Sequence, residues 1–192
     1  MTDLSNGYEE LAETFMRDRT PWIGRSVARA WAESFAPGTE VLELGCGHGV
    51  ITEVLIESGL TVSAVDASPS LLRALRQRFP DVPNECAAAE ESNFFGRTFD
   101  GVIAIGLLFL LAQEAQRTLL RKVASVLRPG GRFLFTAPLQ QVEWIDILTR
   151  QPSRSLGAPE YETILREQDL QVSWGIADEG ENHYFFATKP SQ

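Results

Sequence analysis

The sequence predicts an α/β fold in which a largely parallel sheet is covered by helices on both faces. Short apolar runs, typical of buried strands, alternate along the chain with longer segments whose apolar residues recur at helical spacing. Turns rich in proline and glycine separate these segments. Strands that alternate with helices form right-handed βαβ units, so the 192 residues predict one domain around an open sheet.

The composition of the chain disfavours several classes of protein. Its formal charge of -9 disfavours a nucleic-acid partner, because a phosphate backbone would be repelled. The longest apolar stretch, Val102–Ala112, is far shorter than the roughly 20 residues that cross a membrane, and the N-terminus has no apolar signal region. Cys46 and Cys86 make neither a disulfide framework nor a metal cluster. We therefore expect a cytoplasmic protein with a small-molecule partner, no metal and no membrane insertion.

The chain up to Pro138 gives a regular series of elements. The predicted strands are Val41–Leu44, Thr61–Val65, Asn84–Ala88, Asp100–Ile105 and Arg132–Ala137. The predicted helices are Trp22–Ala36, Val50–Ser58, Ser68–Phe79 and Ala112–Leu127. Proline–glycine pairs end the first and the last of these helices, and Gly59 ends the second. Ser68 is an N-cap residue followed by a proline at the first helical position.

The pattern changes after Pro138. The predicted elements there are a short helix over Gln140–Arg150, a helix over Pro159–Gln168, and strands over Leu170–Gly175 and His183–Thr188. The short helix is predicted from the helical spacing of Trp144 and Leu148. The connection between the last two strands is short enough for a hairpin, so the final strand should run antiparallel to its neighbour.

A cluster of glycines lies between the first predicted strand and the helix that follows it. The stretch Glu43–Gly49 reads E-L-G-C-G-H-G. Glycine lets the backbone approach a ligand closely, and the helix start beyond it offers unpaired N–H groups to an anion. Asp66 ends the next strand, where a carboxylate can accept two hydrogen bonds from a ribose diol. The pattern predicts a nucleoside-binding site at the carboxyl edge of the sheet.

The spacing of the glycines discriminates between nucleoside ligands. A dinucleotide site has the pattern G-x-G-x-x-G, whereas this chain has G-x-G-x-G, with Val50 in place of the third glycine. Glu43 would repel a pyrophosphate but can orient a cationic amine. These residues indicate a ligand with a ribose, a carboxylate and an ammonium, and they make a nicotinamide oxidoreductase the less favoured alternative.

Four motifs in order resemble those of class I S-adenosylmethionine-dependent methyltransferases, most closely the small-molecule group that includes quinone-biosynthesis enzymes. They read VLELGCGHGVIT, VSAVDASPSLL, FDGVIAIGLL and LRPGGRFLF. The resemblance covers residues 8–190. It implies a Rossmann-like sheet of seven strands in the order 3-2-1-4-5-7-6, with strand seven antiparallel. It also implies S-adenosylmethionine as methyl donor and S-adenosylhomocysteine as product.

By motif position, the resemblance also implies a cofactor site. Its residues would be Glu43, Gly45, Cys46, Gly47, Gly49, Asp66, Ala67, Ala89, Glu90 and Ile105. The glycine loop would hold the methionine part, Asp66 the ribose, and Ala67 the adenine. The chain departs from the family at Ala88, where an acid usually binds the adenine amino group. Either Glu90 or Glu91 takes over that role, or backbone and apolar packing alone hold the adenine.

Sulfonium methyl transfer depends on alignment and exclusion of water, so no catalytic triad is expected. An oxygen nucleophile would need a general base, and His183 at the start of the last strand is the first candidate. Asp146 and Glu143, in the short helix predicted after Pro138, are further candidates, with a solvent-exposed face as their alternative role. A structural role is the alternative for His183. His48, within the glycine loop, is expected to pack at the helix start or to face the cofactor.

We expect a partly apolar pocket for the methyl acceptor, covered by a helical N-terminal cap over 1–36 and a lid insertion over 139–158. The residues expected around the acceptor are Tyr8, Phe15, Phe109 and Trp144, with Arg19 and Trp22 at the edge. The acceptor atom (O, N, C or S) and the oligomeric state stay open. A non-catalytic protein of the same fold that binds S-adenosylmethionine or S-adenosylhomocysteine is the alternative function.

Overall fold

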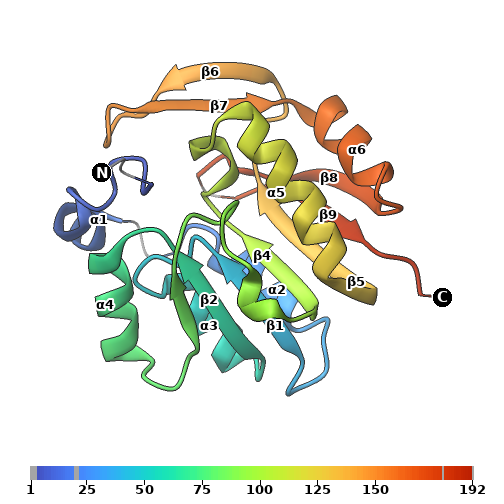
Figure 1. Cartoon of the computed structure of the whole chain (residues 1–192), viewed down its shortest axis with the longest axis horizontal. Helices are drawn as coiled ribbons and strands as arrows, with labels where there is room; N and C mark the ends of the chain where they lie inside the picture. Colours follow the sequence, from blue (N-terminus) through green and yellow to red (C-terminus); the bar gives the residue numbers. More distant parts are fainter. Residues whose placement is uncertain (1–3, 20–21, 179, 192) are drawn as a thin grey trace.

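The computed structural model describes residues 4–19, 22–178 and 180–191, and a seven-stranded sheet forms its centre (Figure 1). In spatial order its strands are β3 (Asn84–Cys86), β2 (Thr61–Asp66), β1 (Glu40–Leu44), β4 (Phe99–Ala104), β5 (Leu127–Thr136), β9 (His183–Thr188) and β8 (Gln171–Ala177). The first five are parallel, and β9 runs antiparallel to both β5 and β8. The predicted strand order and the antiparallel last strand are confirmed.

Helices cover both faces of the sheet. They are α1 (Ala12–Asp18), α2 (Arg25–Ala32), α3 (Val50–Glu57), α4 (Pro69–Arg78), α5 (Gln113–Val126) and α6 (Ala158–Arg166), with short 3₁₀ turns η1 (Phe94–Gly96) and η2 (Leu108–Leu110). Buried residues of α2 and α3 pack with Val41 and Ile103, and α4 extends this layer over β2. Buried residues of α5 and α6 pack with Leu42 and Val102 on the other face. Because successive strand residues point to opposite faces, one apolar run supplies both cores.

Two helix starts follow from local sequence. Ser68 accepts a hydrogen bond from the backbone N–H of Leu71 at 3.2 Å and caps α4. Gly49 precedes α3 with φ of +91°, and a Cβ there would lie 2.8 Å from the Leu75 side chain. Only glycine therefore allows α3 to begin this close to α4.

The segment predicted as a helix over Gln140–Arg150 is instead part of a two-stranded hairpin, so that prediction is wrong. β6 (Gln141–Ile145) pairs antiparallel with β7 (Pro152–Leu156) in a separate sheet. Asp146 closes the connection, because its Oδ1 accepts hydrogen bonds from the N–H groups two and three residues ahead. The hairpin stands apart from the main sheet at the top of Figure 1, close to the N-terminal segment.

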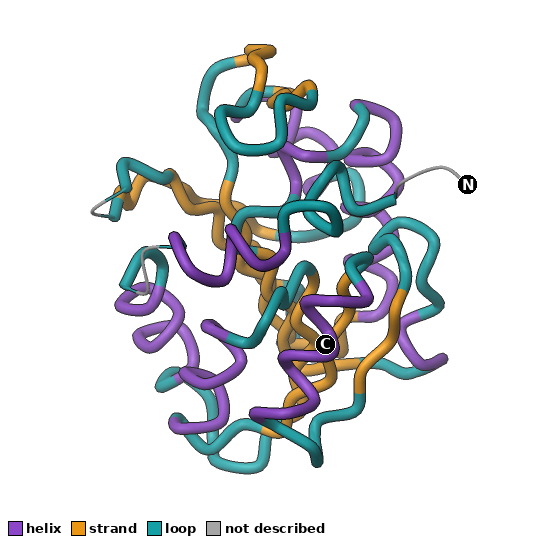
Figure 2. The backbone as a smooth tube through the Cα atoms, turned by 90° about the vertical axis from the view of Figure 1, so that its left-hand side faces the viewer, coloured by secondary structure: helices purple, strands orange, loops and turns teal. Residues whose placement is uncertain are grey.

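The N-terminal elements are shorter than predicted. The helix expected over Trp22–Ala36 is reduced to α2, because Gly24 adopts φ of +83° and starts the helix there. Residues 4–11 form turns before α1, and this segment crosses the same end of the molecule as the hairpin (Figure 2). Within the described ranges, the structure contains no helix that is both long enough and apolar enough to span a membrane.

Candidate functional site

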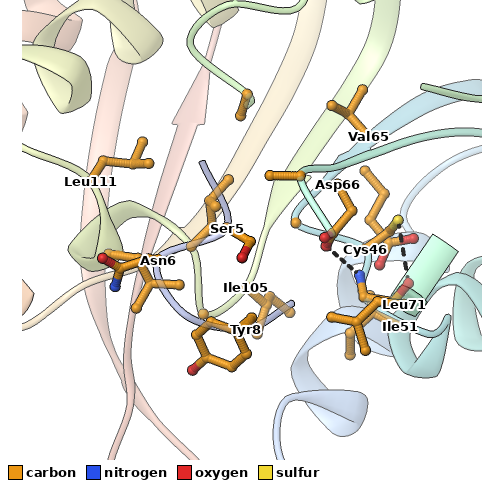
Figure 3. Close-up of a pocket in the computed structure, with 18 of the residues that line it drawn as sticks. Ser5, Asn6, Tyr8, Cys46, Ile51, Val65, Asp66, Leu71, Ile105 and Leu111 are labelled. Carbon is orange, nitrogen blue, oxygen red and sulfur yellow. Dashed lines mark hydrogen bonds between the residues drawn. The ribbon is translucent and has the colours of Figure 1, made fainter. Parts of the chain in front are cut away.

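A cavity of about 240 Å³ lies at the carboxyl ends of β1, β2, β4 and β5. It is closed on the outside by the N-terminal segment, which contributes Tyr8, Phe15 and Arg19 to its lining. Figure 3 shows Asp66 and Cys46 on one side of this cavity and Asn6 on the other, with Tyr8 between them. The cavity therefore lies where the parallel strands end and the helices change faces, the place where ligands bind in open α/β sheets.

The glycine loop forms the floor of the cavity. The N–H of Gly45 donates to the carbonyl of Val65 at 2.8 Å, and the N–H of Gly47 donates to Asp66 Oδ2 at 2.7 Å. A Cβ at Gly45 would meet the Leu107 side chain at 3.1 Å. These bonds fix the loop against β2, and at Gly45 and Gly47 the backbone borders the cavity with no side chain in between.

Asp66 ends β2, and its carboxylate is held in one orientation. Its Oδ1 accepts from the N–H of Ser68 at 2.8 Å, while Oδ2 accepts from Gly47. Burial raises the pKa of Asp66, although the two N–H groups oppose that shift. A carboxylate has about four acceptor positions, so both oxygens keep capacity for hydroxyl groups of a ligand.

Glu43 and Arg19 lie close enough to influence each other's pKa at the opposite end of the glycine loop. Glu43 is 3% exposed and accepts a 2.5 Å hydrogen bond from the Thr52 hydroxyl. Burial raises the pKa of Glu43 to about 8, against the opposing influence of Thr52 and Arg19. Burial lowers the pKa of Arg19, while the nearby Glu43 raises it. Arg19 Nη1 is buried and has no hydrogen-bond partner in the described part of the chain.

Aromatic rings join the N-terminal segment to the glycine loop. The rings of Tyr8 and Phe15 lie edge to face at 5.0 Å, and those of Phe15 and His48 at 5.9 Å. Burial raises the pKa of Tyr8 to about 12, and the Asp146 carboxylate raises it further. Burial lowers the pKa of His48 to about 4, so its ring is neutral at pH 7. Both groups are therefore uncharged at neutral pH.

The far end of the cavity is formed by the residues that follow β3. The N–H of Ala87 donates to the carbonyl of Asp66 at 3.1 Å, which places this stretch beside the end of β2. Ala88 and Ala89 are buried and line the cavity together with Glu90. Glu90 Oε2 is buried without a hydrogen-bond partner among the residues that the structure describes.

Most of the predicted site residues meet at this cavity. Those that line it are Tyr8, Phe15, Glu43, Gly45, Cys46, Gly47, Asp66, Ala67, Ala89, Glu90, Ile105 and Phe109. Three lie outside the lining. Gly49 lies beneath the loop against α4, and Trp144 stands behind Phe109 with ring centroids 5.6 Å apart. His183 is half-buried at the start of β9, and the cavity gives no support to its predicted role as a base.

Several lining residues were not predicted from the sequence, namely Asn6, Thr136 and Asn182. Thr136 ends β5 and accepts a hydrogen bond from the N–H of Gly106 at 2.7 Å. Asn182 directly precedes β9 and donates to Asp178. Their positions at the carboxyl edge of the sheet were a usable signal, since ligands bind there in open α/β sheets. No comparable signal marks Asn6.

The comparisons with known proteins agree with this geometry. Residues 41–131 match the family model described as a methyltransferase domain. The matched residues, just under half of the chain, are similar to a methyltransferase domain. The order of the strands in the sheet is the one that the resemblance implied. So is the glycine loop after β1, with an acidic residue, Asp66, at the end of β2.

Named relatives share this methyltransferase domain. The chain is 42% identical over 120 residues to a demethylmenaquinone methyltransferase of Corynebacterium urealyticum, which covers 62% of this chain and 48% of the relative. It is 41% identical over 107 residues to a cypemycin N-terminal methyltransferase of Streptomyces, covering 53% and 44%. The chain thus spans about half the length of the curated relatives that it matches.

A solved structure extends the likeness in fold to nearly the whole chain. Magnesium protoporphyrin IX methyltransferase from Synechocystis, with bound S-adenosylmethionine, aligns with a TM-score of 0.76 over 98% of both chains. The sequence identity is 14%, so this likeness concerns the fold. Within the described ranges, no group of three or more histidine, cysteine and acidic side chains is placed to hold a metal ion.

Proposed function

We propose that this protein transfers a methyl group from S-adenosylmethionine to a small, partly apolar acceptor. The observation that carries the proposal is the arrangement of three ionisable side chains around one glycine loop. Asp66 lies at the end of β2, and the pair Glu43 and Arg19 lies at the end of β1. Asp66 is suited to bind the two hydroxyl groups of a ribose. Glu43 and Arg19 are suited to bind the ammonium and the carboxylate of an amino acid.

The residues present fit S-adenosylmethionine. Asp66 would accept hydrogen bonds from the ribose hydroxyls, and Glu43 would attract the ammonium. The unpartnered Nη1 of Arg19 would donate to the carboxylate. When bound, the cofactor would supply an electrophilic methyl group on a sulfonium sulfur, which a lone pair of the acceptor would take up while sulfur keeps the electron pair of the broken bond.

The chain contributes alignment and exclusion of water. Tyr8 and Phe15 wall the cavity from outside, and Ile105 and Phe109 supply apolar surface beyond β4. We propose that residues 1–36 act as the cap and that the insertion over 139–158 acts as a lid. Gly7 supports this, because a Cβ there would lie 3.1 Å from Thr149 Cβ in the hairpin loop. The two appended segments therefore meet at this end of the molecule.

A titration with S-adenosylhomocysteine tests the proposal. Isothermal calorimetry should show one site per chain, and Asp66→Ala should weaken binding at least tenfold, because two charge-assisted hydrogen bonds are lost. Asp100→Ala is the matched control, since Asp100 lies near the start of β4, at the opposite end of the strand from the cavity, and binds Arg128. Absence of binding by the unsubstituted protein, or equal binding by Asp66→Ala, would contradict the proposal.

One set of observations favours a second candidate, a non-catalytic protein that binds the same cofactor. The cavity has Ala88 where the family usually has an acid, and its titratable rings, Tyr8 and His48, have pKa values of about 12 and about 4. Neither is matched to general-base work at pH 7. Transfer of a labelled methyl group to a panel of hydroxyl, amine, thiol and carbon acceptors discriminates between the two. Binding without turnover across that panel supports the second candidate.

A further inference from the structure

A tight turn near the start of the described chain places an asparagine side chain at the cavity. Residues 5–8 read Ser-Asn-Gly-Tyr, and the N–H of Tyr8 donates to the carbonyl of Ser5 at 3.1 Å. Between them, Asn6 and Gly7 have φ of +53° and +88°, as in the type I′ turns that an asparagine–glycine pair favours. The local sequence therefore fixes the turn from which the Asn6 side chain lines the cavity.

Contacts on both sides hold this turn in place. The Ser5 hydroxyl accepts a 2.9 Å hydrogen bond from the N–H of Glu9, and the Glu9 carboxylate in turn accepts from the start of α4. On the other side, Gly7 packs against Thr149 in the loop between β6 and β7. Asn6 is therefore positioned before any ligand binds, and a group that is already positioned loses little conformational entropy on binding.

The carboxamide of Asn6 has an unused hydrogen-bonding group. Its Nδ2 atom is buried and has no hydrogen-bond partner within the part of the chain that the structure describes. A buried N–H group without an acceptor is unfavourable, so a ligand that supplies an oxygen to it would be bound more tightly. The Cβ–Cγ torsion of asparagine is broad and roughly two-fold, so the amide can turn its nitrogen into the cavity while the backbone stays fixed.

The position of Asn6 favours the methyl acceptor as the source of that oxygen. Figure 3 shows Asn6 and Asp66 on opposite sides of the cavity, with Tyr8 between them. Tyr8 and Phe109 line the cavity with aromatic rings, and Trp144 packs behind Phe109 with ring centroids 5.6 Å apart. With the ribose of the methyl donor at Asp66, Asn6 borders the space that is left for a second, largely apolar molecule.

The charges around the cavity favour an acceptor without a negative charge. Among the described lining residues, Arg19 alone is cationic at pH 7, because burial lowers the pKa of His48 to about 4. In the proposed function Arg19 binds the carboxylate of the methyl donor. Glu43, Asp66 and Glu90 add acidic groups to the lining. A carboxylate or phosphate on the acceptor would therefore meet no free cation, whereas a neutral oxygen needs only an N–H group.

We propose that the Asn6 carboxamide donates a hydrogen bond to an uncharged oxygen, a carbonyl or a hydroxyl, of the methyl acceptor. Asn6 is then a specificity-determining residue that selects an apolar acceptor carrying such an oxygen over a hydrocarbon of the same shape. A site built to bind a polar group discriminates in this way because its own polar group stays unpaired when the analogue binds. This inference rests on the proposed function, because it requires the methyl donor on the Asp66 side of the cavity.

The test compares acetophenone with α-methylstyrene, which has a CH₂ group in place of the carbonyl oxygen and nearly the same shape. NMR titrations of the protein saturated with S-adenosylhomocysteine give the affinity for each probe. Asn6→Asp replaces the N–H group by an acceptor, and Asn6→Gly removes the side chain. In both variants the ratio of affinities, acetophenone over α-methylstyrene, should fall about tenfold relative to the unsubstituted protein. Benzoate should bind the unsubstituted protein more weakly than acetophenone does.

Two controls accompany the comparison. Asn93→Asp changes an exposed asparagine outside the cavity lining and should leave the ratio unchanged. Asparagine, aspartate and glycine all tolerate a positive φ, so both Asn6 variants should keep the turn, and thermal unfolding verifies the fold. Both should also bind S-adenosylhomocysteine within about twofold of the unsubstituted protein, because Asn6 lies across the cavity from Asp66.

The outcomes separate this inference from the proposed function. If the unsubstituted protein does not bind S-adenosylhomocysteine, both are overturned. If it binds S-adenosylhomocysteine but the loaded protein does not bind acetophenone, or binds benzoate more tightly, only the inference is overturned. A merely structural role for Asn6 would weaken both probes equally and leave their ratio unchanged, which also overturns the inference. So would a large loss of S-adenosylhomocysteine binding in both variants, because Asn6 would then hold the methyl donor.

Discussion

The carboxylate of Glu9 accepts a 2.7 Å hydrogen bond from the hydroxyl of Ser70, at the start of α4. Glu9 also accepts from the backbone N–H of Ser70 at 3.0 Å and from the Ser68 hydroxyl at 2.5 Å. Burial raises the pKa of Glu9, but the serine hydrogen bonds outweigh it and lower the pKa overall. A negative charge at a helix N-terminus is favourable. One side chain thus ties the N-terminal segment to the helix that follows Asp66.

Loss of the hydrogen bonds between Glu9 and the start of α4 should weaken the attachment of the N-terminal segment that lines the cavity. Glu9→Ala should lower the free energy of unfolding by about 1 kcal/mol and weaken binding of S-adenosylhomocysteine about threefold to tenfold. Glu10→Ala, at the exposed neighbouring position, is the control. Because the folded pKa of Glu9 is lowered, its stabilisation is present at neutral pH and is lost as the pH falls through that value. Limited proteolysis should cleave Glu9→Ala faster than Glu10→Ala. Equal rates of cleavage would show that Glu9 does not hold the N-terminal segment against α4.

The elements that surround the cavity were predictable because each has a local signal. Ser68 and Pro69 mark the start of α4, and the glycine loop marks the turn from β1 to α3. Asp66 could be assigned to a strand end because a short, β-branched segment with apolar residues at Val62, Ala64 and Val65 precedes it. The floor of the cavity therefore follows from short segments of sequence.

The hairpin of β6 and β7 could not be predicted in the same way. No residue of β6 is fully buried, so that strand shows no alternation between apolar and polar positions. Ser153 and Ser155 of β7 are buried, and serine gives no apolar signal. The spacing of Trp144 and Leu148 matched a helix by coincidence. Arg19 was placed only at the edge of the pocket, because its burial beside Glu43 depends on how the N-terminal segment folds back.

Arg19 should recognise the carboxylate of the cofactor. The unsubstituted protein should bind S-adenosylhomocysteine about tenfold or more tightly than its decarboxylated analogue, and Arg19→Gln should remove most of that difference. Arg17→Gln is the matched control, since Arg17 lies on the same segment but is exposed and paired with Asp18. Calorimetry with both ligands measures the effect. A preference that survives Arg19→Gln would show that another group receives the carboxylate.

Glu43 should make the ligand-free protein less stable as the pH rises. Burial raises the pKa of Glu43 to about 8, with Thr52 and Arg19 opposing the shift. Above about pH 4.3, the ordinary pKa of glutamate, the unfolded chain has released a proton that the folded state keeps. Stability should therefore fall by up to about 1.4 kcal/mol per pH unit until the folded pKa is reached.

Glu43→Gln isolates this contribution because glutamine has no proton to lose. Urea unfolding gives the free energy of unfolding of both proteins at about pH 5.5 and about pH 7.5. Relative to the unsubstituted protein, the variant should be more stable at the higher pH than at the lower pH. Asp66 also lies near Glu43, and its charge is common to both proteins. Parallel pH profiles for the two proteins would show that Glu43 is already ionised in the folded state.

Substitution of Gly49 tests whether the close packing of α3 against α4 fixes the position of the glycine loop. Alanine there would place a Cβ 2.8 Å from both Leu75 Cδ1 and Phe79 Cε2, and φ is +91°. Gly38 has a similar φ of +82°, but a Cβ at that position would have no neighbour within 4 Å, so Gly38→Ala carries the backbone strain without the clash. We expect Gly38→Ala to cost about 1 kcal/mol and Gly49→Ala about 2–4 kcal/mol by urea unfolding. Only Gly49→Ala should also weaken S-adenosylhomocysteine binding, because the clash displaces the loop that forms the cavity floor. If the two variants lose the same free energy of unfolding, the side chains of Leu75 and Phe79 move aside without cost. The packing of Gly49 against α4 then does not fix the glycine loop.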